Sequence, residues 1–175
     1  MKDQETMRVG VVVERRRIDH PWQEYSWRPV EIVPGAPTTT EWRVLHAGGG
    51  RTRYLAGAPA LELSATRTEG YRFNLSQRIP VVFVVLRRDD GSPEHPYKVF
   101  HATVDPAEAQ EYLEGGEDLV EGVPMPDAIV AWMRDYIARH HIEAPFRKHR
   151  RKPRESGAAA NDAAVAGGAT GPDRG

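Results

Sequence analysis

The residues best suited to chemistry are the paired histidines His140 and His141, which His149 follows. A zinc motif on a helix places two histidines four residues apart on one face. Adjacent residues of a helix instead point about 100° apart, so this pair is poorly placed to chelate one ion. The chain also has no cysteine to complete such a site. The spacing therefore predicts no metal and no other cofactor, and it favours packing roles near a helix C-terminus.

The other chemical candidates are equally incomplete. Three consecutive glycines at 48–50 could suggest a phosphate-binding loop, but such a loop ends in Gly-Lys-Ser/Thr and precedes a helix. The residues that follow, 51–54, predict a strand, so the glycines predict a hairpin turn. Four acids have no visible catalytic partner: Glu62, Glu69, Glu108 and Glu111. Because the sequence indicates no catalytic residue, it favours a protein that is not an enzyme.

Two groups of residues could instead bind a partner. Trp22, Trp27 and Trp42 fall within about twenty residues, and large aromatic residues can anchor a partner, although they more often fill cores or sheet edges. A basic collar at 147–154 carries six Lys/Arg and no acid. The candidate partner-binding residues are Trp22, Trp27, Arg147, Lys148, Arg150 and Arg151. Because residues 1–146 carry a net charge of −5, the pattern differs from that of a duplex-binding domain.

These groups must be positioned by a domain whose core is the run at 81–86, the longest apolar run in the chain. Six such residues predict a strand buried on both faces, led by Val82, Val84 and Leu86. The alternation of Tyr71, Phe73 and Leu75 predicts a half-exposed strand before it. Further short strands are expected at 8–18, 25–33, 41–46, 53–56, 60–66 and 97–104.

Pro29 has no backbone N–H to donate, so its strand is expected at a sheet edge or at a bulge. On the first strand, Val9, Val11 and Val13 share one side, which Arg15 is expected to continue into solvent.

Helical signals begin at Asp105, an acidic N-cap before Pro106, with Ala109, Tyr112 and Leu113 as the buried stripe. Residues 119–123 read as an extended link, and a longer helix follows from 127 to near His141. The predicted fold class is therefore α+β, with a bent antiparallel β-sheet or small barrel followed by two C-terminal helices.

The domain organisation follows from composition. We expect a flexible N-terminus at 1–7, one α+β domain at 8–146, the basic collar at 147–154 and a disordered Gly/Ala-rich tail at 155–175. The polar start and the shortness of every apolar run predict a cytoplasmic protein that does not contact a membrane.

Several segments together resemble a known family: 11–16, 22–35, 61–63, 68–75, 84–87, 106–112, 123–126 and 140–148. They are similar to an uncharacterised proteobacterial family, a domain of unknown function, and the resemblance covers about 7–152. The genes of that family lie beside those of formate dehydrogenase and its maturation factors. The resemblance thus implies a working context and no catalytic residue.

The leading hypothesis is a non-catalytic accessory protein in the molybdenum-dependent formate dehydrogenase system, with that enzyme or its maturation factors as the protein partner. One alternative is a nucleic-acid-associated regulator that uses the basic collar, which would bind only weakly and in a salt-sensitive way. The other is a small enzyme or ligand-binding barrel with a pocket lined by Trp and Arg. The oligomeric state stays open.

Overall fold

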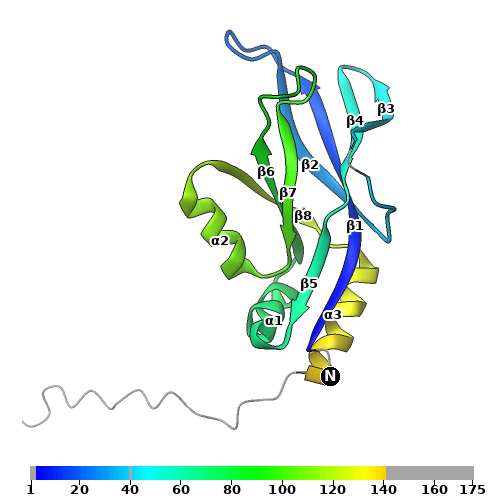
Figure 1. Ribbon diagram of the computed structural model, residues 1–175, viewed down its shortest axis with the longest axis vertical. Helices are drawn as coiled ribbons and strands as arrows, with labels where there is room; N and C mark the ends of the chain where they lie inside the picture. Colours follow the sequence, from blue (N-terminus) through cyan, green and yellow to red (C-terminus); the bar gives the residue numbers. More distant parts are fainter. Residues whose placement is uncertain (1–2, 40, 141–175) are drawn as a thin grey trace, which may run out of the picture. The chain divides into compact units, whose positions relative to one another are not determined.

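The computed structural model describes residues 3–39 and 41–140. Its elements, in chain order, are β1 (Gln4–Arg17), β2 (Tyr25–Pro34), β3 (Arg43–Gly48), β4 (Arg51–Gly57), β5 (Ala60–Ser64), a 3₁₀ turn (Ala65–Arg67), α1 (Thr68–Ser76), β6 (Val81–Arg88), β7 (Tyr97–Thr103), α2 (Pro106–Gly115), β8 (Asp118–Pro124) and α3 (Asp127–His140). Figure 1 shows α1 and α3 at one end of the strands, and the β1–β2, β3–β4 and β6–β7 connections at the other.

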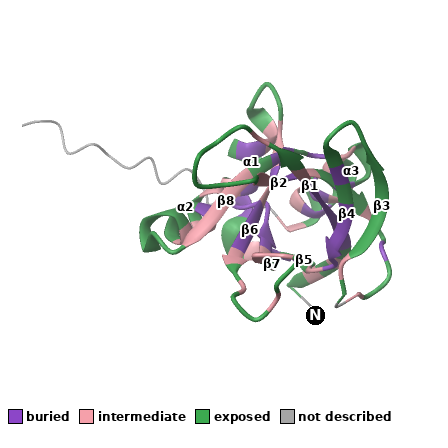
Figure 2. Cartoon of the chain, turned by 90° about the horizontal axis from the view of Figure 1, so that it is seen from above, coloured by how far each residue is buried: buried purple, intermediate pink, exposed green. Residues whose placement is uncertain are grey.

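The strands form two antiparallel sheets. The larger has the order β2-β1-β4-β3, with β5 also paired to β1, and the smaller has the order β7-β6-β8. The predicted α+β class is confirmed, with a bent sheet that does not close into a barrel in the described part of the chain. Seen from above, buried residues gather between the strands, whereas β3 is exposed along its length (Figure 2).

Strand β1 organises the larger sheet because it changes partners along its length. Its first residues, from Gln4 to Arg8, pair with β5, and later residues pair with β2 and β4. Gly10 lies at this change, where an added Cβ would lie 2.8 Å from the Cβ of Ala36. Only glycine fits so close an approach without displacing the backbone.

The expected flexible N-terminus at 1–7 needs a correction, since β1 already begins at Gln4. Pairing with β5 satisfies the backbone of this segment. Helix α3 also holds it, because the Tyr136 hydroxyl donates to the carbonyl of Asp3 and Trp132 Nε1 donates to Glu5 at 3.2 Å.

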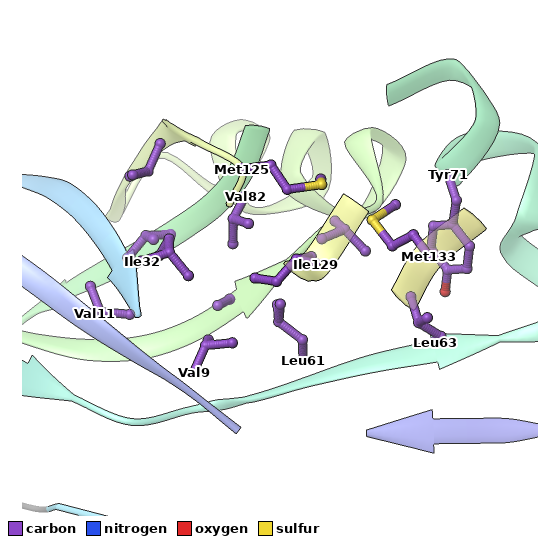
Figure 3. Packing of buried hydrophobic residues seen from close by; sticks show 14 of the residues in the cluster. Val9, Val11, Ile32, Leu61, Leu63, Tyr71, Val82, Met125, Ile129 and Met133 are labelled. Atoms are coloured by element: carbon purple, nitrogen blue, oxygen red, sulfur yellow. The ribbon is translucent and has the colours of Figure 1, made fainter. Parts of the chain in front are cut away.

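The core lies between the two sheets and α3. Val82, Val84 and Leu86 of β6 are fully buried, as predicted. Val85 points to the opposite face and is also fully buried, because α2 packs against that side of the smaller sheet. Figure 3 shows Ile129 and Met133 of α3 among the core side chains.

The strand expected at 71–75 is helix α1 instead. Its buried residues Thr68, Tyr71 and Asn74 recur every three positions, which is a helical spacing, while Phe73 is 60% exposed. The Asn74 amide donates to the carbonyls of Val81 and Val104 at 2.8 and 2.9 Å, and its oxygen accepts from the Val81 N–H at 3.0 Å. This side chain therefore joins α1 to the start of β6 and the end of β7.

Helix α2 starts as predicted, with Asp105 as its N-cap. The Asp105 carboxylate accepts from the Ala107 N–H at 3.0 Å, and Gly116 adopts a left-handed φ of 73° at the C-terminus. Leu113, expected to be buried, is 49% exposed. The expected link at 119–123 is strand β8, which pairs with β6 along its length.

Two turn and edge predictions are confirmed. Strand β2 lies at the edge of the larger sheet, and its register with β1 skips Val30 directly after Pro29, which is a β-bulge. Gly49 and Gly50, both with positive φ, form the β3–β4 hairpin turn.

Candidate functional site

An open pocket of about 860 Å³ is lined by the larger sheet and by the β6–β7 connection. Six of its residues define the aromatic pocket of this protein: Arg15, Tyr25, Trp27, Trp42, Tyr54 and His95. They come from β1, β2, β4 and the connections that precede β3 and β7. Strand pairing brings them together, because Arg15 is the direct neighbour of Trp27 and Val13 that of Tyr54.

Four rings of the pocket form one interlocked cluster. Trp42 stacks on His95 with ring centroids 4.4 Å apart and planes 17° apart. Trp27 stacks on Tyr54 at 6.0 Å, and Trp42 meets Trp27 and Tyr54 edge-on at 5.7 and 5.4 Å. Such contacts stabilise aromatic pairs beyond the burial of their area, so the walls of the pocket hold one another in place.

Arg15 supplies the charge at this wall. Its guanidinium carbon lies 4.3 Å from the ring centroid of Tyr25 and 5.9 Å from those of Trp27 and Tyr54. Its Nη2 donates to the Thr52 hydroxyl at 3.3 Å. No ion pair involves this half-buried side chain within residues 3–39 and 41–140, so its positive charge faces the pocket without an acidic partner.

The electrostatics of the pocket favour a neutral His95. Burial lowers the pKa of this imidazole below its usual value, and the nearby charge of Arg15 lowers it further, while Glu94 opposes both effects. At neutral pH the pocket therefore carries the Arg15 charge beside an uncharged aromatic wall.

Trp22 lies in the β1–β2 connection at the same end of the domain. Its side chain is 87% exposed, the largest value among the exposed large apolar residues of the described chain. Its backbone N–H donates to His20 Nδ1 at 3.1 Å, and its connection borders the Gly49–Gly50 turn across a shallow hollow. The two predicted aromatic residues therefore lie in different surroundings. Trp27 is half-buried in the aromatic pocket, whereas Trp22 projects from a loop.

The outer face of the larger sheet carries a second charged group, which we name the arginine face: Arg16, Arg43, Arg51 and Arg53, with His46 beside them. Arg16 pairs directly with Arg51, and His46 with Arg53. Residues directly opposite in an antiparallel pair share a face, and like charges there destabilise the sheet. Only Arg53 has an acidic partner in the described ranges, the buried Glu14 at 3.1 Å.

Glu108, His101 and His140 have structural roles away from the pocket. Glu108, which lacked a visible partner in the sequence, is bound by His101 Nε2 at 2.6 Å and by the Thr103 hydroxyl at 2.8 Å. These bonds hold the start of α2 on β7. His140 stacks on Tyr136 with ring centroids 4.3 Å apart. No group of three potential metal ligands occurs in the part of the chain that the structure describes.

Arg147, Lys148, Arg150 and Arg151, the rest of the basic collar, His141, His149 and the tail at 155–175 all lie outside the described residues. No described helix has the length and apolar character that a membrane crossing requires.

Of the six residues of the aromatic pocket, the sequence indicated Trp27 as a candidate and grouped Trp42 with it, but it gave no site role to Arg15, Tyr25, Tyr54 or His95. The alternation of β1 did place Arg15 on the core-facing side, and this was the signal available. The prediction that Arg15 points into solvent was wrong, because the residues that surround it come from strands and loops that are distant in the sequence. Nothing in the local pattern of residues 93–96 indicates that His95 packs on Trp42.

A family model described as "Protein of unknown function (DUF3305)" matches residues 8–150, which is more than half of the chain. No curated protein and no solved structure matches the chain.

Proposed function

The chain belongs to the DUF3305 family, a family of proteins of unknown function, and on this premise we propose that it is a non-catalytic accessory protein that binds an acidic protein partner. The observation that carries this proposal is the exposure of Trp22, which is 87% accessible at the tip of a loop. The indole of Trp22 is exposed to water, and a partner surface could bury it. Trp is also among the residue types most enriched at interface hot spots.

The arginine face favours an acidic partner. Arg16 and Arg51 are direct cross-strand neighbours, and neither has an ion-pair partner in the described part of the chain. An acidic surface docked here would relieve their repulsion and would also steer association. The predicted residues Arg147, Lys148, Arg150 and Arg151 would act in the same way.

The resemblance in the sequence suggests the partner. We propose formate dehydrogenase or one of its maturation factors, met in the cytoplasm. An accessory role needs no catalytic group of its own, and an exposed aromatic side chain with a basic surface suits recognition.

The arginine face also permits the second hypothesis, nucleic-acid binding. Single strands are held by basic grooves together with aromatic side chains on which bases stack. The arginine face has the charge, but its described residues include no Trp, Tyr or Phe. A protein partner therefore accounts better for this surface.

The test measures association of the full chain with purified formate dehydrogenase and with each maturation factor. Trp22→Ala should weaken binding by about 2 kcal/mol or more, as for a hot spot. Phe73→Ala is the matched control, since Phe73 is an exposed aromatic residue on α1 at the opposite end of the strands. Unchanged affinity of Trp22→Ala would contradict the proposed surface.

Charge is tested separately. The double variant Arg16→Glu/Arg51→Glu should weaken binding in a way that added salt imitates, because exposed charges act through a screened field. A control that places Glu at the exposed residues Arg78 and Arg88 changes the net charge equally and should have a smaller effect. An oligonucleotide that binds at physiological salt and depends on Arg16 and Arg51 would favour the second hypothesis.

In the host, gene deletion should lower active formate dehydrogenase without abolishing its synthesis.

A further inference from the structure

We propose that the aromatic pocket binds a small planar anion, meaning a flat ring that carries a carboxylate or phosphate group. The pocket lies on the inner face of the larger sheet, whereas the arginine face lies on its outer face. Binding of such a ligand therefore goes beyond the proposed protein partner, and either one can fail without the other.

The charge of Arg15 selects an anion. A guanidinium that is partly removed from water loses hydration and needs a compensating partner. Arg15 receives cation–π contacts from Tyr25, Trp27 and Tyr54 and a single hydroxyl acceptor, but no carboxylate within the described ranges. A ligand carboxylate or phosphate would supply the bidentate acceptor that a guanidinium fits.

Among the charged residues that line the pocket, Arg15 is the one placed to bind the anionic group of the ligand. Arg88 lies 3.4 Å from the carboxylate of Asp90 and is thereby paired. The acids Glu24 and Glu94 are exposed at the rim, where water screens them. His95 is neutral at pH 7 and contributes a ring rather than a charge.

The walls select a flat ring. Trp27, Trp42 and Tyr25 are all half-buried, so part of each ring faces the pocket. Ligand pockets typically combine such aromatic walls with a small number of polar groups that fix orientation. A ring can stack on these surfaces while its anionic group reaches Arg15, as guanidinium and aromatic faces lie side by side here.

The size of the pocket sets the scale of the ligand. Its volume of about 860 Å³ falls within the range of small-molecule sites, about 300–1,000 Å³. That volume suits an aromatic carboxylate or a mononucleotide. Aromatic carboxylates and mononucleotides both combine a flat ring with an anionic group, and the experiment distinguishes between these two classes of ligand.

The experiment uses nuclear magnetic resonance of the full chain, whose four tryptophans give four indole N–H signals. Naphthalene-2-carboxylate and AMP are the two probes, one for each source. Naphthalene-2-carboxamide and adenosine lack the charge, and cyclohexanecarboxylate lacks the flat ring. At least one charged ring probe should shift the Trp27 and Trp42 signals saturably, with a dissociation constant of about 1 mM or tighter. Trp22 and Trp132 lie outside the pocket lining and serve as internal controls.

Two variants locate the anion. Arg15→Gln should weaken binding of the charged probe about tenfold and leave the carboxamide unaffected. Arg16→Gln is the matched control, because Arg16 is the next residue on the strand and points to the opposite face. If Arg15→Gln fails to fold, the comparison of carboxylate with carboxamide on the unmodified chain still tests the charge.

The outcomes divide cleanly. Preference for the carboxylate supports an organic acid as the source, and preference for AMP supports a nucleotide. The proposal is overturned if neither charged probe shifts Trp27 and Trp42 saturably, if the neutral probes bind equally well, or if Arg16→Gln weakens binding as much as Arg15→Gln.

Discussion

Arg15 and Arg16 are adjacent in the sequence and serve opposite surfaces. The pleat of β1 turns Arg15 toward the aromatic pocket and Arg16 toward the arginine face. A one-residue shift of register would exchange the two environments. The β-bulge of β2 at Val30 lies between the core and these arginines, and it therefore helps set which side chains reach the pocket.

A second residue-scale feature is the ion pair of Asp118 with Arg87. Arg87 donates to both carboxylate oxygens, from Nε at 2.9 Å and from Nη2 at 3.0 Å, and the two residues are direct neighbours on β8 and β6. These hydrogen bonds lower the pKa of the Asp118 carboxyl below 3.8, although burial opposes the shift. A bidentate arrangement of this kind is the strong form of such a pair.

The consequence is a pH-dependent contribution to stability. Because the folded-state pKa is lowered, the contribution is fully present above pH 3.8 and is lost as the pH falls through the folded value. Asp118→Asn should therefore be less stable than the unmodified chain at neutral pH, and the difference should shrink below pH 3.8. Urea unfolding across the acid range measures it. Asp90→Asn, at an exposed residue of the β6–β7 hairpin, is the control; a pH-independent difference for Asp118→Asn would contradict the assignment.

At the scale of elements, α1 is held by the buried amide of Asn74 rather than by apolar burial alone. The amide serves three backbone groups, one donor and one acceptor of Val81 and the carbonyl of Val104. Each of these groups would be left without a partner in the interior if the side chain were removed.

Asn74→Ala should therefore lower the free energy of unfolding by about 3 kcal/mol. Gln77→Ala provides the comparison, since Gln77 is exposed and its side chain makes one bond, to the carbonyl of Phe73. That variant should change stability by less than about 0.5 kcal/mol. Equal effects of the two substitutions in urea unfolding would show that Asn74 does not hold α1 to the sheet.

At the scale of the whole molecule, the described domain has two unlike ends. The helices α1 and α3 lie at one end, and the β1–β2, β3–β4 and β6–β7 connections lie at the other (Figure 1). Trp22 belongs to the β1–β2 connection, and His95 of the aromatic pocket belongs to the β6–β7 connection. The buried core joins α3 to both sheets, and the proposed recognition residues lie on the connections and on the strands next to them. Binding residues on loops carried by a rigid scaffold are a common division of labour in proteins.

The sequence also makes a prediction about the C-terminal segment. Residues 156–175 contain five Gly and seven Ala and no aromatic residue, so they offer too little apolar area to offset the entropy of ordering. Deleting them should leave the melting temperature unchanged. A chain that ends after residue 126 is the contrasting control, because it lacks the buried Ile129, Met133 and Tyr136 and should not fold. A melting temperature several degrees lower for the short deletion would show that the segment packs on the domain.

Several features of the fold could be predicted because they depend on neighbouring residues alone. The alternation of Val9, Val11 and Val13 gives β1, and Asp105 with Pro106 gives the start of α2. Helix α1 was missed because Tyr71, Phe73 and Leu75 satisfy an alternating pattern, whereas the burial of Thr68, Tyr71 and Asn74 follows a spacing of three. The choice between the two patterns depends on Asn74 meeting Val81 and Val104, which local sequence does not specify.

The sequence by itself determined the class of the fold, the turn at Gly49 and Gly50 and the edge position of Pro29, since each depends on steric or hydrogen-bonding preferences within a few residues. Only the tertiary structure decided that Arg15, Tyr54 and His95 share one pocket. They are separated by 39 and 41 residues along the chain, and they meet because the sheet register aligns β1 with β4 and the β6–β7 connection closes over them. Contacts of that kind depend on how the two sheets pack, and packing sums weak interactions over the whole core.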